Sequence, residues 1–325
     1  MGVSWGIHDD RAKRFGPARL LRPGGRFGYD DPMIREISAK TLVSRVQGLD
    51  TYFGLDYGMN LYRGCQHRCI YCDSRSLCYG IEDFDGEVLI KTNAPELLRA
   101  ELARKRRKGV IGTGSMNDPY MPLEREVGLT RRALEVIAEL DFGVHVITKS
   151  DLVLRDIDIL RRIRRARPAV VSLTVTTADD DLAARVEPGS PSPSRRFEAL
   201  KALDEAGIEV RVALMPVLPF IEDTWENVST ILERAHACGV RTVVPWFGMS
   251  LRDRQRAYYY RRLDELLPGV RARYEARYGG DYGCPAPDAR ALSARFDVRC
   301  RELDVATSVR PSLAPTTRMR PLFEM

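Results

Sequence analysis

The sequence lacks the features that place a protein in or across a membrane. No window approaches the run of about 18 uncharged apolar residues that spans a bilayer. Residues 1–16 contain no apolar signal core, and Gly6 stands where a myristoylation signal requires Ser or Thr. We therefore expect a cytoplasmic protein with no membrane partner. Thiols stay reduced in that compartment, so clustered cysteines more often indicate metal or redox chemistry than disulfides.

A strong excess of charge of one sign is also missing. The 51 Lys+Arg and 45 Asp+Glu leave a net charge of +6 over 325 residues, and 44% of the residues are hydrophobic. This composition excludes an intrinsically disordered chain, and a chain of this length buries a large core without disulfide staples.

The small positive charge is unevenly distributed along the chain. Basic runs at 99–108 and 161–167 fall in expected helices, and we interpret them as solvated helix faces. The stretch 11–26 holds six basic residues and no acidic one among Gly and Pro. This stretch is expected to be an irregular basic arm, with phosphate binding as its predicted role.

Short β-branched runs alternate with amphipathic stretches from about residue 57 to 250. We expect strands at Val88–Lys91, Val110–Gly114, Val144–Thr148, Val170–Thr176, Val210–Met215 and Val243–Trp246. We expect helices near 94–107, 130–141, 153–167, 194–207, 224–238 and 251–267. Such repeats predict right-handed βαβ units and a parallel sheet, either a partial or full β/α barrel or a doubly wound open sheet. In both folds the reactive site lies at the carboxyl ends of the strands.

The pattern changes on either side of this region. Residues 1–50 are expected to form an irregular N-terminal arm, residues 51–268 the β/α domain, and residues 269–325 a C-terminal extension with one helix near 288–302. Tyrosines between 257 and 282 lie among basic residues, where they would either stack on bases or pack against one another.

The strongest chemical signal is a loop with three cysteines. Cys65, Cys69 and Cys72 lie within eight residues, and thiolates at this spacing can surround one soft metal centre. A closed zinc site needs four ligands. Within the loop, only His67 could be the fourth ligand beside the three cysteines. The favoured interpretation is a [4Fe-4S] cluster with one iron left open. The alternatives are zinc and unliganded structural thiols.

This loop resembles the signature of the radical S-adenosylmethionine (SAM) superfamily. That signature is CxxxCxxC with an aromatic residue before the last cysteine, matched here by Tyr71. The resemblance implies a TIM-like partial (β/α)6 barrel, a [4Fe-4S] cluster and SAM as cofactors, and a reductant such as flavodoxin or ferredoxin. It further implies that SAM is cleaved to a 5′-deoxyadenosyl radical that abstracts a substrate hydrogen.

Further stretches are similar to the spore photoproduct lyase-like group, often labelled DNA-repair photolyases. They are YRGCQHRCIYC, GTGSMNDPYMPLE, ITKS, SLTVTT, RVEPGSPSPSRR and ALMPVLP, spanning about residues 57–220. The resemblance implies that SAM is held by Tyr71, Gly114, Ser115, Lys149, Ser172 and Ala213. For each residue the alternative is an ordinary turn, surface or packing role. Asn117 and Asp118 are candidates for the substrate site or for a plain turn, and Arg185 with Glu187 for an ion pair that shapes the SAM site.

One departure from the group concerns the return of hydrogen to the product. Spore photoproduct lyases carry a cysteine two positions before the residue that corresponds to Ser115, and this chain has Thr113 there. The O–H bond of threonine is too strong to donate a hydrogen atom. Cys78 and Tyr120 are the candidate donors, although burial as a small hydrophobic residue is the simpler expectation for Cys78. Cys238, Cys284 and Cys300 lack paired spacing and are interpreted as bystanders.

The leading hypothesis is a radical SAM enzyme that acts on nucleic acid, most simply on a pyrimidine lesion in DNA. The first alternative keeps the chemistry and changes the substrate to a small metabolite or peptide. The second is a non-catalytic Fe–S or zinc protein that binds nucleic acid. At the C-terminus, Leu322 and Phe323 resemble part of a sliding-clamp peptide, with docking of the tail on its own domain as the alternative.

Overall fold

A seven-stranded sheet forms the centre of the protein. The computed structural model describes residues 19–21, 33–48 and 50–308. The strand order is β11-β10-β9-β8-β7-β4-β3, and every pairing is parallel except that of β3 with β4. The strands are β3 (Val43–Arg45), β4 (Tyr57–Met59), β7 (Val110–Thr113), β8 (Gly143–Thr148), β9 (Ala169–Thr174), β10 (Glu209–Leu214) and β11 (Val243–Pro245). Strands β3 and β11 lie at the two ends of this order and do not pair with each other, so the six parallel strands form a partial barrel, as expected.

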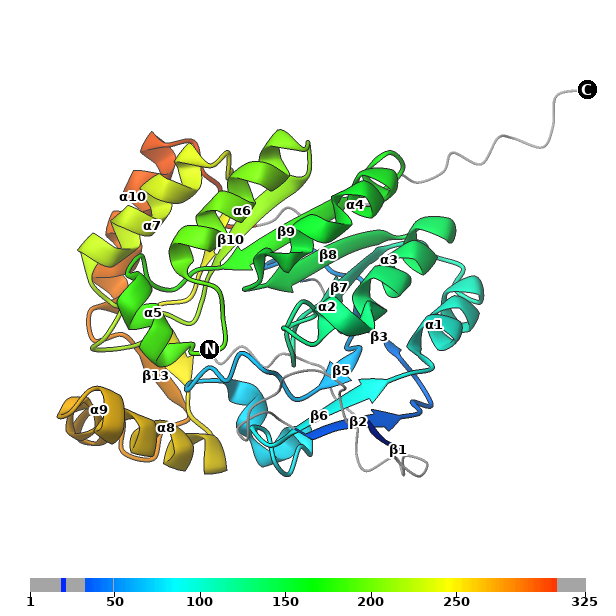
Figure 1. Ribbon diagram of the computed structural model, residues 1–325. Coiled ribbons are helices and arrows are strands. Elements are labelled where there is room, and N and C mark those ends of the chain that lie inside the picture. The colour runs from blue at the N-terminus through cyan, green and yellow to red at the C-terminus, as the bar shows by residue number, and fades with distance from the viewer. Residues whose placement is uncertain (1–18, 22–32, 49, 309–325) are drawn as a thin grey trace, which may run out of the picture.

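Helices cover the outer face of this sheet because each turns one apolar stripe toward it. In Figure 1 they form an arc from α1 to α7 and α10. They are α1 (Ala94–Ala103), α2 (Glu124–Val127), α3 (Leu129–Glu139), α4 (Ile157–Arg164), α6 (Pro193–Glu205), α7 (Trp225–Ala237) and α10 (Ala289–Glu302). A short 3-10 helix, η3 (Asp151–Asp156), precedes α4, and α5 (Asp180–Val186) follows β9.

The inner face of the sheet carries polar and small side chains. Strand residues alternate between the two faces, so Val171 and Leu173 pack in the outer core while Ser172 points inward. The Ser172 hydroxyl lies 2.7 Å from Nε2 of His145 on the neighbouring strand. Burial lowers the pKa of His145 to about 3, with help from the charge of Arg211. The imidazole is therefore neutral at physiological pH.

Four short strands of the N-terminal half form a second sheet, a feature that the expectation of an irregular arm missed. Their order is β1-β2-β6-β5, with β1 (Arg19–Leu21), β2 (Met33–Ile37), β5 (Tyr62–Arg63) and β6 (Glu87–Lys91). The expected strand at Val88–Lys91 is thus real but belongs to this sheet. Strands β1, β2 and β5 escaped detection because two to five residues are too few to show a clear alternation.

The C-terminal part packs around a cluster of tyrosines. It contains β12 (Gly248–Ser250), α8 (Asp253–Leu266), α9 (Val270–Tyr278) and β13 (Gly283–Pro285), which lie together at the lower left of Figure 1. Tyr259, Tyr260, Tyr274 and Tyr278 are buried against one another. For these four residues the packing alternative is confirmed, because a buried ring cannot stack on a base.

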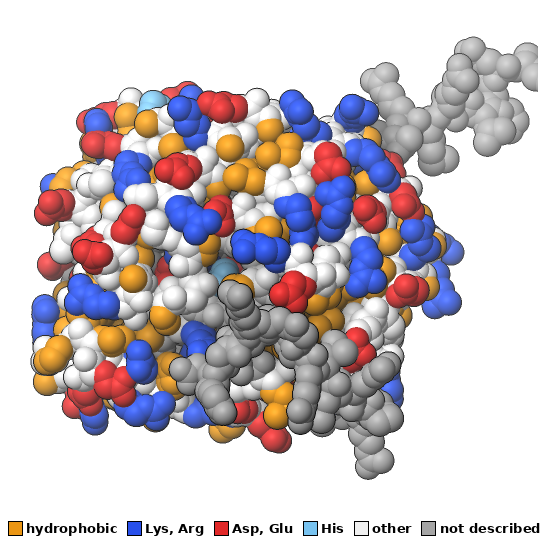
Figure 2. Space-filling model, viewed as in Figure 1, with side chains coloured by type: hydrophobic (Ala, Val, Ile, Leu, Met, Phe, Trp, Pro, Cys, Tyr) orange, Lys and Arg blue, Asp and Glu red, His pale blue; other side chains and the backbone are white. Residues whose placement is uncertain are grey.

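Two sequence-based expectations fall largely or wholly on segments outside the described residues. These are the basic arm at 11–26, of which only the backbone of 19–21 is described, and the clamp-like tail at Leu322 and Phe323. In the described part of the chain, no helix combines the length and the apolar character needed to cross a bilayer. On the face shown in Figure 2, basic and acidic side chains are interspersed, as expected for solvated helix faces.

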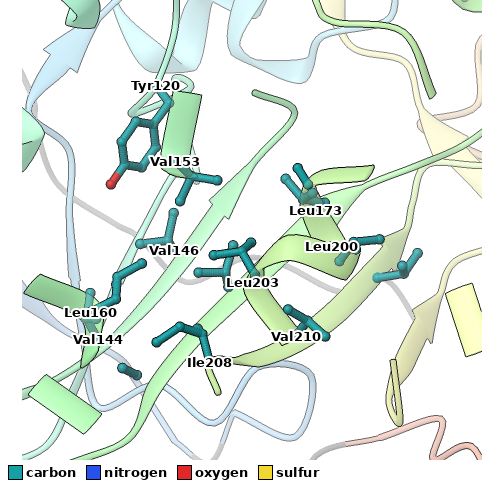
Figure 3. Close-up of a cluster of buried hydrophobic side chains, with 14 of the residues drawn as sticks. Tyr120, Val144, Val146, Val153, Leu160, Leu173, Leu200, Leu203, Ile208 and Val210 are labelled. Carbon is teal, nitrogen blue, oxygen red and sulfur yellow. The ribbon is translucent and has the colours of Figure 1, made fainter. Parts of the chain in front are cut away.

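The outer core predicts a large effect of truncating Leu200. This residue of α6 is fully buried and lies beside Leu203 and Val210 (Figure 3). Leu200→Ala should lower the free energy of unfolding by about 3 kcal/mol, because it leaves a void in the core. Lys201→Ala, at an exposed position of the same helix, should change it by less than about 0.5 kcal/mol. Anaerobic urea unfolding measures both, and equal midpoints would contradict this packing.

Candidate active site

The three-cysteine loop leaves strand β5 at a glycine and ends at the 3-10 helix η1 (Asp73–Arg75). Gly64 has φ of +82°, and a Cβ there would lie 2.3 Å from the Glu87 carbonyl oxygen. Only glycine lets the loop start so close to β6. Cys65 and Cys69 are buried and Cys72 is half-buried. Burial raises the pKa of all three thiols, that of Cys69 to about 12.

Neighbouring segments hold the loop in place by its backbone. The Ile70 amide donates to the carbonyl of Val186 (2.9 Å), and the Gly189 amide donates to that of His67 (3.0 Å). A Cβ on Gly189 would lie 2.1 Å from the Gln66 carbonyl oxygen, so this contact also needs glycine. From the other side, Gln255 of α8 donates to the Tyr71 carbonyl (2.9 Å). The loop is therefore seated between the α5–α6 connection and the C-terminal part.

The donor set of the loop fits an iron–sulfur cluster. Three buried thiols supply soft ligands, and the backbone N–H of His67 and that of Ser74 favour the thiolates of Cys65 and Cys72. Raised thiol pKa values mean that binding of a metal must displace the protons. The three cysteines would each hold a different iron of such a cluster.

A buried carboxylate, Glu187, joins the cysteine loop to the sheet. It lies in the α5–α6 connection and is 1% exposed. The Tyr71 hydroxyl donates to its Oε1, and Nζ of Lys149 lies 3.8 Å from the same atom. The guanidinium of Arg196, also 1% exposed, donates to Oε2. A second nitrogen of Arg196 donates to the Thr174 carbonyl at the end of β9 (3.0 Å).

The partner of Glu187 differs from the expected one. Arg185 lies exposed on α5, because it is on the face of that helix away from the core, whereas Arg196 enters from α6. Burial opposes the charge of Glu187, but Arg196 and Lys149 hold its pKa below the ordinary value. Burial likewise opposes the charge of Lys149, but Cys69 and Glu187 hold its pKa above the ordinary value. Lys149 therefore stays cationic beside the cysteine loop.

A second carboxylate, Asp118, connects the loop to the end of β8. It accepts hydrogen bonds from the Thr148 hydroxyl (2.6 Å) and the Lys149 amide (2.7 Å). Its Oδ2 lies 3.3 Å from Nδ1 of His67 in the cysteine loop. Burial would raise the pKa of Asp118, but His67 and these donors lower it to about 2. Asp118 is thus part of the site framework, and its side chain is not free for substrate.

Several residues expected to hold SAM lie along the carboxyl edge of the sheet. Gly114 has φ of +98°, and a Cβ there would lie 2.1 Å from the Ile147 carbonyl oxygen. Ser115 is exposed just beyond it, with its hydroxyl 3.3 Å from Oδ1 of Asn60. Ala213 packs its methyl group on Phe53, and its backbone is level with Thr174. Strand register places Ser172 two residues deeper in the sheet than Ala213.

The two candidate hydrogen donors lie in different surroundings. Tyr120 is fully buried among outer-core side chains such as Val153 (Figure 3), and its hydroxyl donates to Asp156 (3.0 Å). Its hydroxyl therefore belongs to a separate polar network. Cys78 is exposed rather than buried, because the 3-10 helix η2 (Leu77–Tyr79) runs along the surface. Its sulfur lies 3.1 Å from a guanidinium nitrogen of Arg252.

Two residues of the site were not identified from the sequence. Arg196 is part of the RVEPGSPSPSRR stretch, but nothing in its spacing singles it out from Arg195. Glu222 is fully buried after β10, where it accepts hydrogen bonds from the Thr176 hydroxyl (2.9 Å) and the Leu218 amide (3.0 Å). Burial raises the pKa of Glu222 to about 8, with a contribution from the charge of Glu187. The only signal was the proximity of its segment to a strand end.

Comparison with known families identifies the catalytic type. Residues 59–235, more than half of the chain, match the family described as the Radical SAM superfamily. An uncharacterized protein of Mycobacterium tuberculosis is 29% identical over 256 residues, which cover 77% of this chain and 75% of the relative. An uncharacterized protein of Methanocaldococcus jannaschii is 37% identical over 175 residues, which cover 52% of this chain and 63% of that protein.

Solved structures share the fold. A spore photoproduct lyase complexed with dinucleoside spore photoproduct superposes with a TM-score of 0.63 at 13% identity, covering 84% of this chain and 80% of that chain. At this identity the likeness concerns the architecture alone. It covers most of both chains, in agreement with the partial barrel.

Each loop cysteine should be needed for the cluster. Cys65→Ala, Cys69→Ala or Cys72→Ala should abolish the visible absorbance of the anaerobically reconstituted protein and lower its iron and acid-labile sulfide to background. Cys238→Ala, a half-buried thiol at the end of α7, should leave all three signals unchanged. Loss of the cluster in the Cys238 variant, or its retention in any loop variant, would contradict this assignment.

The charge of Glu187 should matter for stability. Glu187→Gln leaves the buried Arg196 guanidinium without a counter-charge, so the free energy of unfolding should fall by about 3 kcal/mol. Glu198→Gln, on the exposed side of α6, serves as the matched control and should be neutral. The measurement is anaerobic urea unfolding of the reconstituted proteins. Identical midpoints for the two variants would show that the ion pair is not formed.

Proposed function

This chain belongs to the radical SAM superfamily, and we propose that it is a cytoplasmic enzyme that abstracts hydrogen from a nucleic-acid substrate, a pyrimidine lesion in DNA. Membership makes the chain an enzyme that uses a [4Fe-4S] cluster and SAM. The substrate class is the further step. Its main support is the likeness of the fold to a lyase that was solved with a dinucleoside photoproduct.

The cofactors would be held by the cysteine loop and by residues at or near the carboxyl edge of the central sheet. Cys65, Cys69 and Cys72 would bind the cluster. The residues for SAM would be Tyr71, Gly114, Ser115, Lys149, Ser172 and Ala213. When bound, the cluster and SAM supply one-electron cleavage of the sulfonium and, from it, the hydrogen-abstracting radical.

The protein side chains orient these groups and keep water away from them. Lys149 is a half-buried cation beside Cys69, which suits it to hold the SAM carboxylate. Glu187 fixes its position and that of Tyr71 through one shared oxygen. Because Lys149 and Tyr71 are already held by the buried Glu187, their side chains need little rearrangement when SAM binds.

The route of hydrogen return must differ from that of a cysteine-dependent lyase. Thr113 stands at the position of the donor cysteine, and its buried hydroxyl has no hydrogen-bond partner among the described residues. We assign the return step to a group other than Thr113. Cys78, with its exposed thiol, fits this role better than Tyr120, whose hydroxyl is bound to Asp156.

The proposed partners follow from the same chemistry. Reduced flavodoxin or ferredoxin would supply the electron, and the basic arm at 11–26 would bind DNA phosphates. Contact with a sliding clamp through Leu322 and Phe323 is a further, separate proposal.

Deuterium transfer tests the proposed substrate. UV-irradiated DNA made with thymidine deuterated on its ring and methyl group should pass deuterium into 5′-deoxyadenosine, detected by mass spectrometry. Lys149→Met should abolish 5′-deoxyadenosine formation because the SAM carboxylate loses its partner, while Lys201→Met, at an exposed position, should not change it. SAM cleavage without deuterium transfer from irradiated or intact DNA would exclude the nucleic-acid substrate and favour a metabolite or peptide.

A further inference from the structure

A buried arginine lies directly behind the cysteine loop. Arg75 is the last residue of η1, three positions after Cys72, and it is 4% exposed. Its Nε donates to the Cys69 carbonyl (3.4 Å), so the guanidinium lies against the backbone of the loop. An arginine stays charged in a protein, and burial of that charge is costly unless it is compensated. The residues proposed to hold SAM do not include this cation.

The guanidinium of Arg75 is held by a carboxylate and two aromatic rings. Its two terminal nitrogens each donate to one carboxylate oxygen of Asp85 (both 2.6 Å). The guanidinium carbon lies 3.6 Å from the ring centroid of Tyr258 in α8 and 4.6 Å from that of Phe84. A bidentate pair and stacked rings fix both the place and the plane of a guanidinium. The positive charge therefore keeps a constant position relative to the loop.

The medium between this charge and the cysteines is apolar. Phe84 forms a hydrophobic cluster with Ile81 and Cys65, and Cys72 packs against this cluster. A charge acts more strongly across such a medium than through water. Its effect is evident at Cys72, where burial raises the pKa of the thiol and the charge of Arg75 is the largest effect in the opposite direction. Arg75 thus favours negative charge on the loop.

The counter-charge of Arg75 differs from that of the other cations near the loop. Lys149 and Arg196 share Glu187, whose side chain is fully buried with them. The side chain of Asp85 is 34% exposed, whereas that of Arg75 is 5% exposed. Water screens an exposed carboxylate more than a buried guanidinium. The pair of Arg75 and Asp85 therefore leaves a net positive field toward the loop.

A fixed cation in this place affects how readily a bound cluster takes up an electron. One-electron reduction of a [4Fe-4S] cluster adds a negative charge to a buried centre, so nearby positive charge stabilises the reduced state more than the oxidised state. We propose that Arg75 raises the reduction potential of the cluster and so eases its reduction by the electron donor. This inference rests on the cluster and is independent of the identity of the substrate.

An anaerobic redox titration of the reconstituted protein without SAM, followed by EPR, tests this proposal. Arg75→Leu removes the charge and keeps an apolar side chain in its place. At the potential where the wild-type cluster is half reduced, its ratio of reduced to oxidised cluster should fall about ten-fold, a midpoint shift of about 59 mV to more negative potential. Arg75→Lys should stay closer to the wild type, because it retains the positive charge.

An exposed arginine beside the loop provides the matched control. Arg185 precedes Val186, whose carbonyl accepts from the Ile70 amide of the loop. Because the Arg185 side chain is exposed, water screens its charge. Arg185→Leu should therefore leave the midpoint potential unchanged.

The counter-charge provides a variant with an effect of opposite sign. Asp85→Asn keeps the shape of the side chain and removes the negative charge, so the midpoint should move to more positive potential. A purely structural role of Arg75 would loosen the loop in both Arg75→Leu and Asp85→Asn. It does not account for midpoint shifts in opposite directions.

The other outcomes overturn the proposal. Wild-type midpoints in both Arg75→Leu and Asp85→Asn would show that the charge does not act on the cluster. Equal shifts in Arg75→Leu and Arg75→Lys would assign the effect to packing. If Arg75→Leu fails to retain iron and sulfide, Asp85→Asn decides, and an unchanged or more negative midpoint there overturns the proposal. A wild-type protein without a cluster would contradict the cofactor assignment and the inference with it, whereas failure of the nucleic-acid substrate would leave these potentials unaffected.

Discussion

The buried carboxylate of Glu187 is the interaction on which the arrangement of the site depends. It has two oxygens and three partners, which come from the cysteine loop, the end of β8 and helix α6. A charge that is 1% exposed is tolerated only because Arg196 and Lys149 compensate it. Any movement of the loop relative to the sheet would leave one of these charges unpaired. The electrostatic cost of that state keeps Tyr71 and Lys149 in one relative position.

Asp118 adds a second, independent connection of the same kind. It joins His67 of the loop to the Thr148 hydroxyl and the Lys149 amide, so Lys149 is positioned through its backbone by one carboxylate and through its side chain by another. Glycines at 64, 114 and 189 provide the close backbone approaches that these connections require. The outer core supports the site only indirectly, by fixing the strands whose ends carry it.

Much of this organisation could be predicted from local sequence. The strand at β8 and the helix at α7 lie within two residues of their expected bounds, because β-branched runs and apolar stripes are local signals. The cysteine loop was identified for the same reason, since its three ligands are close in the chain. Strands β2 and β3 were missed because they are short, and Arg196 was missed because its partner is set by how α6 packs. The direction of the Tyr120 hydroxyl, toward Asp156, likewise depends on packing between distant segments.

The sequence by itself determined the chemistry of this protein: the thiol spacing, the βαβ repeat and the glycines that allow close turns are all properties of short segments. Only the tertiary structure decided which charges meet and which rings are left open. Glu187 pairs with Arg196 rather than Arg185, and Trp246 is exposed while nearby Phe247 is buried. Burial and long-range pairing arise from the packing of elements far apart in the chain, and no local pattern encodes them.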